Sequence, residues 1–499
     1  MVKAKTLTQN TAYYTLALII QKVLAFVYFA FLARGLGVED QGKYTFAFSF
    51  TTIFSVFVDV GLASVLTREI AKDREQTKKI LANVLGVKLI LSVFAYLLIV
   101  TVINLMNYPP LTKQLVYLTG FIMLLDNFST TFWGVLRGNQ NLKYESIGGI
   151  IFQFLVVGLG LTLLALKVGV TLQVLAVMAG SAFLCIFSYA EMRRRLHFLP
   201  HLELNWPLIK KLIIIAIPFA LTGILARLNT QVDTIFLSKI GCATHQICDA
   251  NVGIYSVATK IILAIHFIPL AFVAALFPAL SEYFVTDKER LARTFEKAMK
   301  YLMAIGLPVA FGLLSLAPDF VPQLFGAEYK NSVLPLQVLA ISLPFLFLTF
   351  PIGSLLNACS KQIQNTRQVA IAAAVNALLN IYLIPKLTYT GGALSSLAST
   401  VVMLILGIFA ARKIADYNKK YLWLSFGQCF LSGAVMGGVL YFLLFKVSFL
   451  VLIPLGAVIY ILMLFLTGGI KKSEIEEMLM SMKLRRRAAP EGPVDGSLT

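Results

Sequence analysis

Charged residues are scarce in this chain of 499 residues: they make up 13% of it, whereas 58% of the residues are hydrophobic. A soluble protein carries about 25% charged and roughly 45–50% apolar residues, so this balance excludes a soluble globular enzyme. The apolar residues gather in runs of about 20, the helix length that crosses roughly 30 Å of hydrocarbon. The composition therefore predicts a multi-pass helical membrane protein.

Acidic residues are the scarcer charged type: the chain has 24 Asp and Glu and 43 Lys and Arg, which gives a net charge of +19. The basic residues sit in short clusters between apolar runs, with no folded soluble segment to present them to nucleic acid. Such clusters are typical of anchoring at an anionic membrane surface. We therefore expect membrane lipids, and no nucleic acid, as partners.

Motifs of nucleotide and hydrolytic chemistry are also missing. The sequence has no Walker loop, no Gly-rich dinucleotide turn and no arrangement of nucleophile, His and acid. A membrane glycosyltransferase or polymerase would need a large outer loop with carboxylates, and the sequence has no such loop. We therefore expect no enzymatic activity, no cofactor and no metal site.

The apolar runs divide into candidate spans whose loops can be tested for charge asymmetry. We predict fourteen spans, at residues 12–34, 44–66, 81–105, 113–136, 147–166, 171–191, 210–238, 253–281, 298–317, 332–357, 368–386, 391–411, 423–445 and 448–469. With both termini in the cytosol, the inner segments hold 31 Lys and Arg and the outer loops hold 8. Basic residues prefer the cytosolic side, so the sequence predicts a multi-pass protein of the plasma membrane in this orientation.

Two stretches of the chain repeat. Leu36-Gly37 followed by Gln41-Gly42-Lys43-Tyr44-Thr45 matches Ile240-Gly241 followed by Val252-Gly253-Ile254-Tyr255-Ser256. Six predicted spans separate the copies, so both have the same orientation, as in transporters built from parallel repeats. We predict an all-α protein with two parallel six-helix lobes, at residues 1–200 and 201–415. Two further helices at 416–470 and a basic cytosolic tail at 471–499 complete it.

Several motifs resemble those of polysaccharide flippases in the multidrug/oligosaccharidyl-lipid/polysaccharide (MOP) superfamily. They are Ala33-Arg34-Gly35-Leu36-Gly37, Gly42-Lys43-Tyr44, Asp59-Val60-Gly61-Leu62 with Arg68-Glu69, Asp233 before Gly253-Ile254-Tyr255, Asn376 to Asn380 before Ile384-Pro385, and Gly391-Gly392-Ala393. The resemblance covers nearly the whole chain. It implies a MATE-like fold and alternating access.

The resemblance also implies a substrate, a polyprenyl-linked oligosaccharide carried from the inner to the outer leaflet, with glycan-assembly proteins as candidate partners. Two alternatives remain. Lipid II flippases are similar but have a more Arg-rich first helix, whereas here Lys22 stands nearly alone. MATE-like exporters of small cations usually stop at twelve helices, and their site would favour carboxylates and aromatics over cations.

Basic residues inside the spans are the candidate substrate site, because an isolated charge at the bilayer centre costs roughly 2.5–3.5 kcal/mol. We expect Lys22, Arg227 and Lys260 to line a central cavity and bind the phosphate headgroup. One face of the predicted span 210–238 carries Arg227, Thr230, Gln231 and Thr234, at helical spacing. The alternative is that the cations form structural ion pairs with Asp59, Asp126 or Asp233.

Two of these acids are also candidates for ion coupling. Either Asp59 or Asp233 could bind a proton or Na⁺, although a salt bridge or a hydrogen bond to a neighbouring helix is the more ordinary role for an intramembrane carboxylate. Cys242 and Cys248 lie in a loop predicted to be outside, where a disulfide is chemically favoured. Free thiols are the alternative, and His245 between them makes only a weak metal signal.

Overall fold

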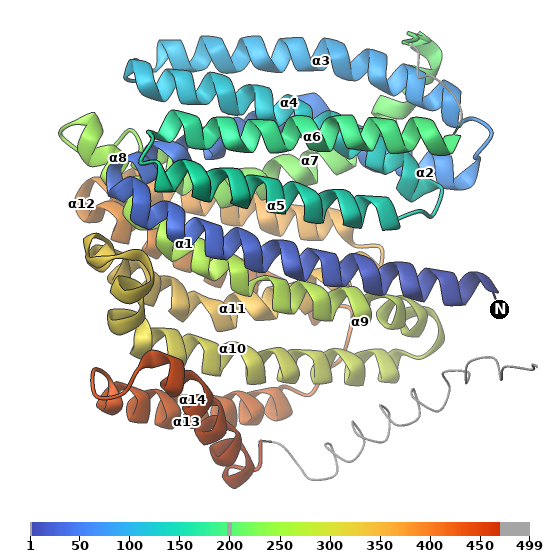
Figure 1. Ribbon diagram of the computed structural model, residues 1–499. Helices are drawn as coiled ribbons and strands as arrows, with labels where there is room; N and C mark the ends of the chain where they lie inside the picture. Colours follow the sequence, from blue (N-terminus) through green and yellow to red (C-terminus); the bar gives the residue numbers. More distant parts are fainter. Residues whose placement is uncertain (1, 197–201, 470–499) are drawn as a thin grey trace, which may run out of the picture.

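The computed structural model describes residues 2–196 and 202–469; the predicted basic tail at 471–499 lies outside them. The described part is helical throughout (Figure 1). Its elements are α1 (Val2–Asp59), α2 (Leu62–Lys72), α3 (Thr77–Leu105), α4 (Pro110–Gly138), α5 (Lys143–Ala165), α6 (Val170–Leu196), α7 (Trp206–Leu237), α8 (His245–Ile265), α9 (Phe267–Thr286), α10 (Lys288–Phe325), the 3₁₀ helix η1 (Ala327–Ser332), α11 (Val333–Ala358), α12 (Gln362–Ala411), α13 (Lys419–Leu443) and α14 (Phe449–Leu466).

The fourteen predicted spans all have a helical counterpart. Eleven described stretches are long and apolar enough to cross a membrane. Two of them, Leu16–Asp59 and Gln362–Ala411, contain two crossings each, on either side of non-helical backbone at Gly37 and Thr388. The 32-residue α7 is the remaining crossing. The spans predicted at 44–66 and 253–281 are each interrupted, at Val60–Gly61 and at His266.

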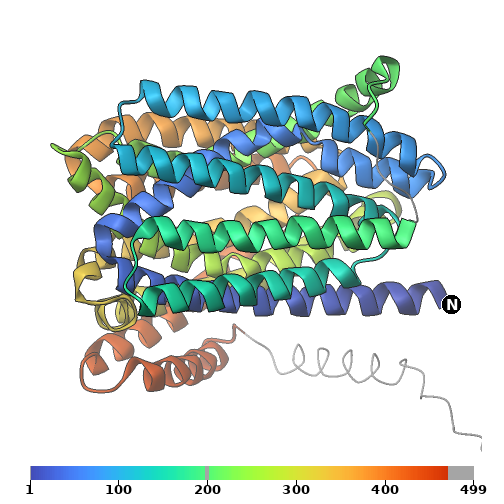
Figure 2. The same ribbon diagram turned by 45° about the horizontal axis from the view of Figure 1, so that its top comes forward.

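Two lobes form the bundle, as the repeat predicts. In the first, α5 packs on α6 and α1, and α4 packs on α6. In the second, α11 packs between α10 and α12, and α7 packs on α12. The helices run roughly side by side, and α13 with α14 attaches at the edge formed by α10 (Figures 1 and 2).

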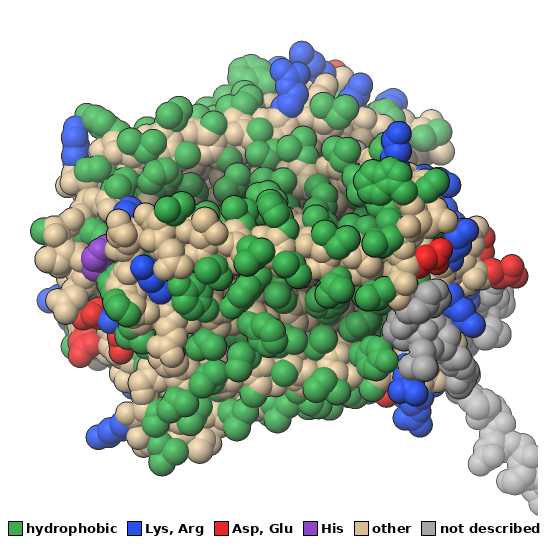
Figure 3. Space-filling view, turned by 90° about the horizontal axis from the view of Figure 1, so that it is seen from above, with side chains coloured by type: hydrophobic (Ala, Val, Ile, Leu, Met, Phe, Trp, Pro, Cys, Tyr) green, Lys and Arg blue, Asp and Glu red, His purple; other side chains and the backbone are tan. Residues whose placement is uncertain are grey.

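The surface of the bundle matches a lipid environment. Apolar side chains cover its middle, and basic side chains gather toward its ends (Figure 3). Leu97, Ile186 and Phe442 are among the large apolar side chains left exposed, at 60%, 68% and 72%. Such an apolar belt is stable only in hydrocarbon, so this is a multi-pass membrane protein.

The repeated glycines form the seam between the lobes. Gly37 and Gly241, equivalent in the two copies, both have left-handed backbone, at φ 75° and 80°. At Gly37, α1 reverses direction at the end of the bundle opposite its N-terminus (Figure 2). Equivalent Gly42 and Gly253 then bring α1 against α8. A Cβ on Gly42 would collide with the carbonyl oxygen of Asp249, and one on Gly253 with that of Val38.

Two residues of the 3₁₀ helix η1 form hydrogen bonds at the same end of the seam. The Tyr329 hydroxyl donates across the seam to the Ala33 carbonyl at 3.1 Å, and the Ser332 hydroxyl holds η1 against α8 of the same lobe by donating to the Ile254 carbonyl at 2.8 Å. Both residues are buried. The two lobes therefore meet tightly at the end of the bundle that the charge asymmetry predicts to face outward.

The seam should not tolerate a side chain at Gly42. We expect Gly42→Val to lower the stability by roughly 1–3 kcal/mol or more, because the obstacle is main chain of α8 that cannot rotate away. The thermal unfolding midpoint of the purified protein measures this. Gly438→Val on α13 is the control, since nothing lies within 4 Å of its added Cβ. Equal midpoints for both variants would contradict the tight seam.

Candidate functional site

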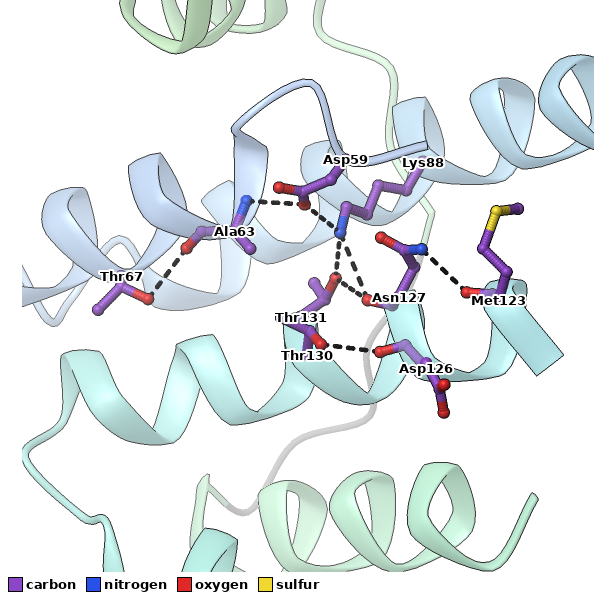
Figure 4. Close-up of polar contacts among 9 residues, drawn as sticks. All are labelled: Asp59, Ala63, Thr67, Lys88, Met123, Asp126, Asn127, Thr130 and Thr131. Atoms are coloured by element: carbon purple, nitrogen blue, oxygen red, sulfur yellow. Dashed lines mark hydrogen bonds and ion pairs between the residues drawn. The ribbon is translucent and has the colours of Figure 1, made fainter. Parts of the chain in front are cut away.

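A buried ion pair lies inside the first lobe. The Lys88 ammonium is 2.6 Å from an Asp59 carboxylate oxygen, and its side chain is 0% exposed. It also donates to the Thr131 hydroxyl at 2.8 Å and to the Asn127 carbonyl at 3.4 Å (Figure 4). The Asp59 carboxylate in turn accepts from the Ala63 N–H at 3.2 Å. This network joins α1, α3 and α4 within the membrane.

Arg227 of α7 lies beside this pair. Its half-buried guanidinium donates to the Thr52 carbonyl at 3.2 Å, and its charge acts on both Asp59 and Lys88. Two cations and one carboxylate share this region, so it keeps a positive charge. The alternative role weighed for Asp59, a structural salt bridge, is the geometry found here, with Lys88 as its partner.

The other polar residues on the predicted face of α7 differ in exposure. Thr230 is exposed and donates its hydroxyl to the Arg227 carbonyl at 3.1 Å. Gln231 is half-buried, and Thr234 is buried at 7% exposure. Accessibility thus falls along the face from Thr230 to Thr234, and a ligand beside α7 would reach Arg227 and Thr230 first.

Lys22 and Lys260 form a second basic group where α1 meets α8. The Lys260 ammonium lies 5.2 Å from the ring centroid of Phe29, within the range of a cation–π contact. Lys22 is exposed, and it is near enough to Lys260 for their charges to repel. The structure therefore brings Lys22 and Lys260 together and places Arg227 in the separate group with Asp59.

None of these three cations forms a salt bridge with a carboxylate of the described residues. Asp59 is taken by Lys88, and the Asp126 carboxylate points away from that pair (Figure 4). A cation held in low dielectric without an acid attracts a ligand anion strongly. The arrangement is therefore chemically suited to an anionic ligand.

Asp233 of α7 has only neutral partners. Its carboxylate, 4% exposed, accepts 2.6 Å hydrogen bonds from the Tyr255 hydroxyl of α8 and from the Asn380 amide and Ser396 hydroxyl of α12. The Asn380 amide also donates to the Asn376 side-chain oxygen at 3.0 Å. A polar cluster thus ties three helices of the second lobe together.

One oxygen in this cluster has no donor. The Asn380 side-chain oxygen is buried and lacks a hydrogen-bond partner, as does the Asn376 amide nitrogen. A buried acceptor beside a carboxylate fits a small hard cation, which prefers oxygen ligands. Sequence reasoning had missed Tyr255 and Ser396, although Tyr255 lies in the repeated motif and Ser396 follows Gly391-Gly392-Ala393 closely.

The paired cysteines lie where the chain enters α8: Cys242 is in the connection after α7, and Cys248 is in the first turn of α8. The structure joins Cys242 to Cys248 in a disulfide. The Thr244 hydroxyl between them caps α8 by accepting from the Ile247 N–H at 3.4 Å. The cross-link closes a short loop next to Asp249, whose carbonyl packs against Gly42. The predicted pairing therefore falls beside the seam.

Two lobes meet at a glycine seam, and the cations between their helices have no salt-bridge partner in the part of the chain that the structure describes. This arrangement defines an integral membrane protein of the transporter class. Comparison with known proteins identifies which kind. Residues 7–284 match the model of the family described as polysaccharide biosynthesis protein, which is more than half of the chain. The chain belongs to this family.

Relatives in two bacteria cover most of the chain. The capsular polysaccharide biosynthesis protein CapF of Staphylococcus aureus is 23% identical over 80% of this chain and 98% of its own length. A candidate O-antigen transporter of Shigella flexneri is 25% identical over 78% of this chain and 94% of its own. These similarities confirm the expected resemblance to polysaccharide flippases at the level of the family.

A solved structure shares the fold. The lipid II flippase MurJ, in an inward closed conformation, superimposes with a TM-score of 0.74 at 18% identity, over 90% of this chain and 97% of that one. The predicted all-α membrane fold is thereby confirmed, and it is shared with this flippase.

The Asp59–Lys88 pair should be needed for stability. We expect Lys88→Gln to lower the unfolding free energy by about 3–5 kcal/mol, because it leaves a carboxylate without its buried partner. Asp59→Asn in the same protein should recover part of that loss, which a double-mutant cycle of denaturation measures. Lys72→Gln, which breaks the exposed pair with Glu69, is the control and should change stability by less than about 1 kcal/mol. Additive effects at positions 59 and 88 would contradict the pairing.

Proposed function

We propose that the protein is a flippase that moves a polyprenyl-linked oligosaccharide from the cytosolic to the outer leaflet by alternating access. The observation that carries this proposal is the set of three intramembrane cations, Lys22, Arg227 and Lys260, without a salt-bridge partner among the described residues. Membership of the polysaccharide biosynthesis protein family supports the substrate class.

The physical problem for such a substrate is its phosphate. Unpaired phosphate charges in hydrocarbon are prohibitively unfavourable, and fixed cations along the path lower that barrier. The guanidinium of Arg227 offers two parallel donors to phosphate oxygens, whereas the ammonium groups of Lys22 and Lys260 act as point charges. Thr230 and Gln231 supply hydrogen-bonding groups next to Arg227, as hydroxyl-rich sugars require.

A second substrate, lipid II, has one observation in its favour: the similarity of the whole fold to a lipid II flippase. Both substrates are polyprenyl-linked sugars, so the same cations would serve either. Genetic complementation distinguishes these two substrates. We expect the chain to restore surface glycan in a strain lacking its capsule or O-antigen flippase, and not to restore growth in a strain lacking its lipid II flippase. The opposite pattern would assign lipid II.

The cations should be required for flipping. We expect Arg227→Gln to reduce flipping in proteoliposomes by about tenfold or more, because a hydrogen bond to a charged group contributes roughly 1.5–3 kcal/mol. Lys260→Gln should act in the same direction. Lys386→Gln, an exposed cation on α12 that lies over the Tyr382 ring, is the matched control. Wild-type flipping by Arg227→Gln at equal expression would remove Arg227 from the site.

We further propose that the cluster around Asp233 binds the coupling ion, Na⁺ or a proton. The partnerless oxygen of Asn380 beside the Asp233 carboxylate supports a small cation, and no second charge is needed to hold it. Asp59 is the weaker candidate because Lys88 already neutralises it. The cluster links α7, α8 and α12, so an ion bound there would change how these helices pack.

Removing the carboxylate should uncouple transport. We expect flipping by the wild-type protein to depend on a Na⁺ or proton gradient, and Asp233→Asn to lose that dependence because it has no negative charge for the ion. Flipping with each gradient imposed separately gives the measurement, and thermal unfolding with and without Na⁺ reports binding directly. Asp416→Asn, on the exposed connection before α13, is the control. Full gradient dependence in Asp233→Asn would refute this assignment.

A further inference from the structure

A cavity of about 230 Å³ lies where α13 meets the second lobe. Side chains of α10, α11, α12 and α13 line it, together with Tyr417 of the connection before α13. Helix α13 packs mainly along α10 and α14, and it has few close contacts with α11 and α12. The cavity occupies that gap, so the protein's own side chains do not fill the space between α13 and the lobe.

The lining divides into an apolar part and a charged part. Met303, Leu348 and Leu404 are typical of the apolar part, whereas Arg412 and Lys419 are its charged residues. Both charged residues are cations, and no carboxylate is among the lining residues. They lie where α12 ends and α13 begins, at the end of the bundle predicted to be cytosolic.

The segment between these two cations is held in place. The Tyr417 ring, 8% exposed, packs on the Phe295 ring with centroids 5.5 Å apart. The Asn418 N–H donates to the Glu296 carboxylate, and the Asn418 side-chain oxygen accepts from the Tyr421 N–H at 3.0 Å. These contacts hold the backbone between Arg412 and Lys419 in place.

We propose that this cavity binds one anionic phospholipid of the membrane, with its phosphate between Arg412 and Lys419 and part of an acyl chain in the apolar part. An apolar cavity at membrane depth does not hold water stably, whereas an acyl chain fills it with matching contacts. An Arg and a Lys at one end of a cavity whose lining residues include no carboxylate match a phosphate in charge. Basic pockets between helices near the cytosolic leaflet recognise lipid headgroups in this way.

The bound lipid occupies the space between α13 and helices α11 and α12 of the second lobe. It contacts α11 and α12 on one side and α13 on the other, where direct packing between these helices is sparse. Anionic phospholipid therefore strengthens the attachment of α13 and α14 to the bundle. This role is independent of the transported substrate, whose proposed cations are on α1, α7 and α8.

The experiment compares lipids added to the delipidated full-length protein in detergent. We expect phosphatidylglycerol to raise the thermal midpoint by roughly 2–4 °C, and neither phosphatidylcholine nor inorganic phosphate to do so. Native mass spectrometry should show one retained phosphatidylglycerol. The double variant Arg412→Gln/Lys419→Gln should weaken this binding by about tenfold, since it removes two charged contacts to the phosphate.

Two further variants test the location. Lys413→Gln/Lys420→Gln removes the same charge from neighbouring exposed residues outside the cavity and should bind phosphatidylglycerol normally. Ile408→Trp should fill the cavity and reduce binding with both cations intact. Equal shifts with phosphatidylglycerol and phosphatidylcholine, or equal losses in the two double variants, would overturn the proposal. Preferential retention of undecaprenyl phosphate would also overturn it, because the occupant would then be substrate.

Discussion

The electrostatic cost of a charge in hydrocarbon governs the interior of this protein. The structure meets that cost in two ways: Lys88 neutralises Asp59 at 2.6 Å, and hydroxyl and amide donors surround Asp233. Arg227, Lys22 and Lys260 form no salt bridge with a carboxylate of the described residues. Because Asp59 and Asp233 have other partners, these cations leave a positive electrostatic potential inside the membrane. This potential favours a negatively charged substrate over a cationic one.

Hydropathy and loop charge predicted the fold, because the bilayer requires about 20 apolar residues per crossing and sorts basic residues to one side. All fourteen spans have helical counterparts. The breaks within them were not predicted: α8 ends at Ile265 and α9 begins at Phe267, although the hydropathy there is continuous. Such breaks depend on packing between helices, which a one-dimensional pattern does not contain.

Sequence predicted the site less completely than the fold. Every intramembrane charged residue could be identified from the sequence, because charged residues stand out in apolar runs. Which of them form ion pairs could not be identified in this way. Asp59 was a candidate ion-pair partner for Lys22, Arg227 or Lys260, yet its partner is Lys88. The donors Tyr255 and Ser396 approach Asp233 from 22 and 163 residues away along the chain. Tertiary contacts between residues that are far apart in the sequence decide which cation pairs with a given acid.

The contact between Gly42 and Gly253 constrains how this chain can diverge. Each glycine faces a carbonyl oxygen of the opposite copy, and a peptide group has no smaller version that a second mutation could introduce. Suppressor mutations elsewhere cannot make room for a methyl group at either position. Any side chain at Gly42 or Gly253 would therefore have to displace main chain of the other lobe.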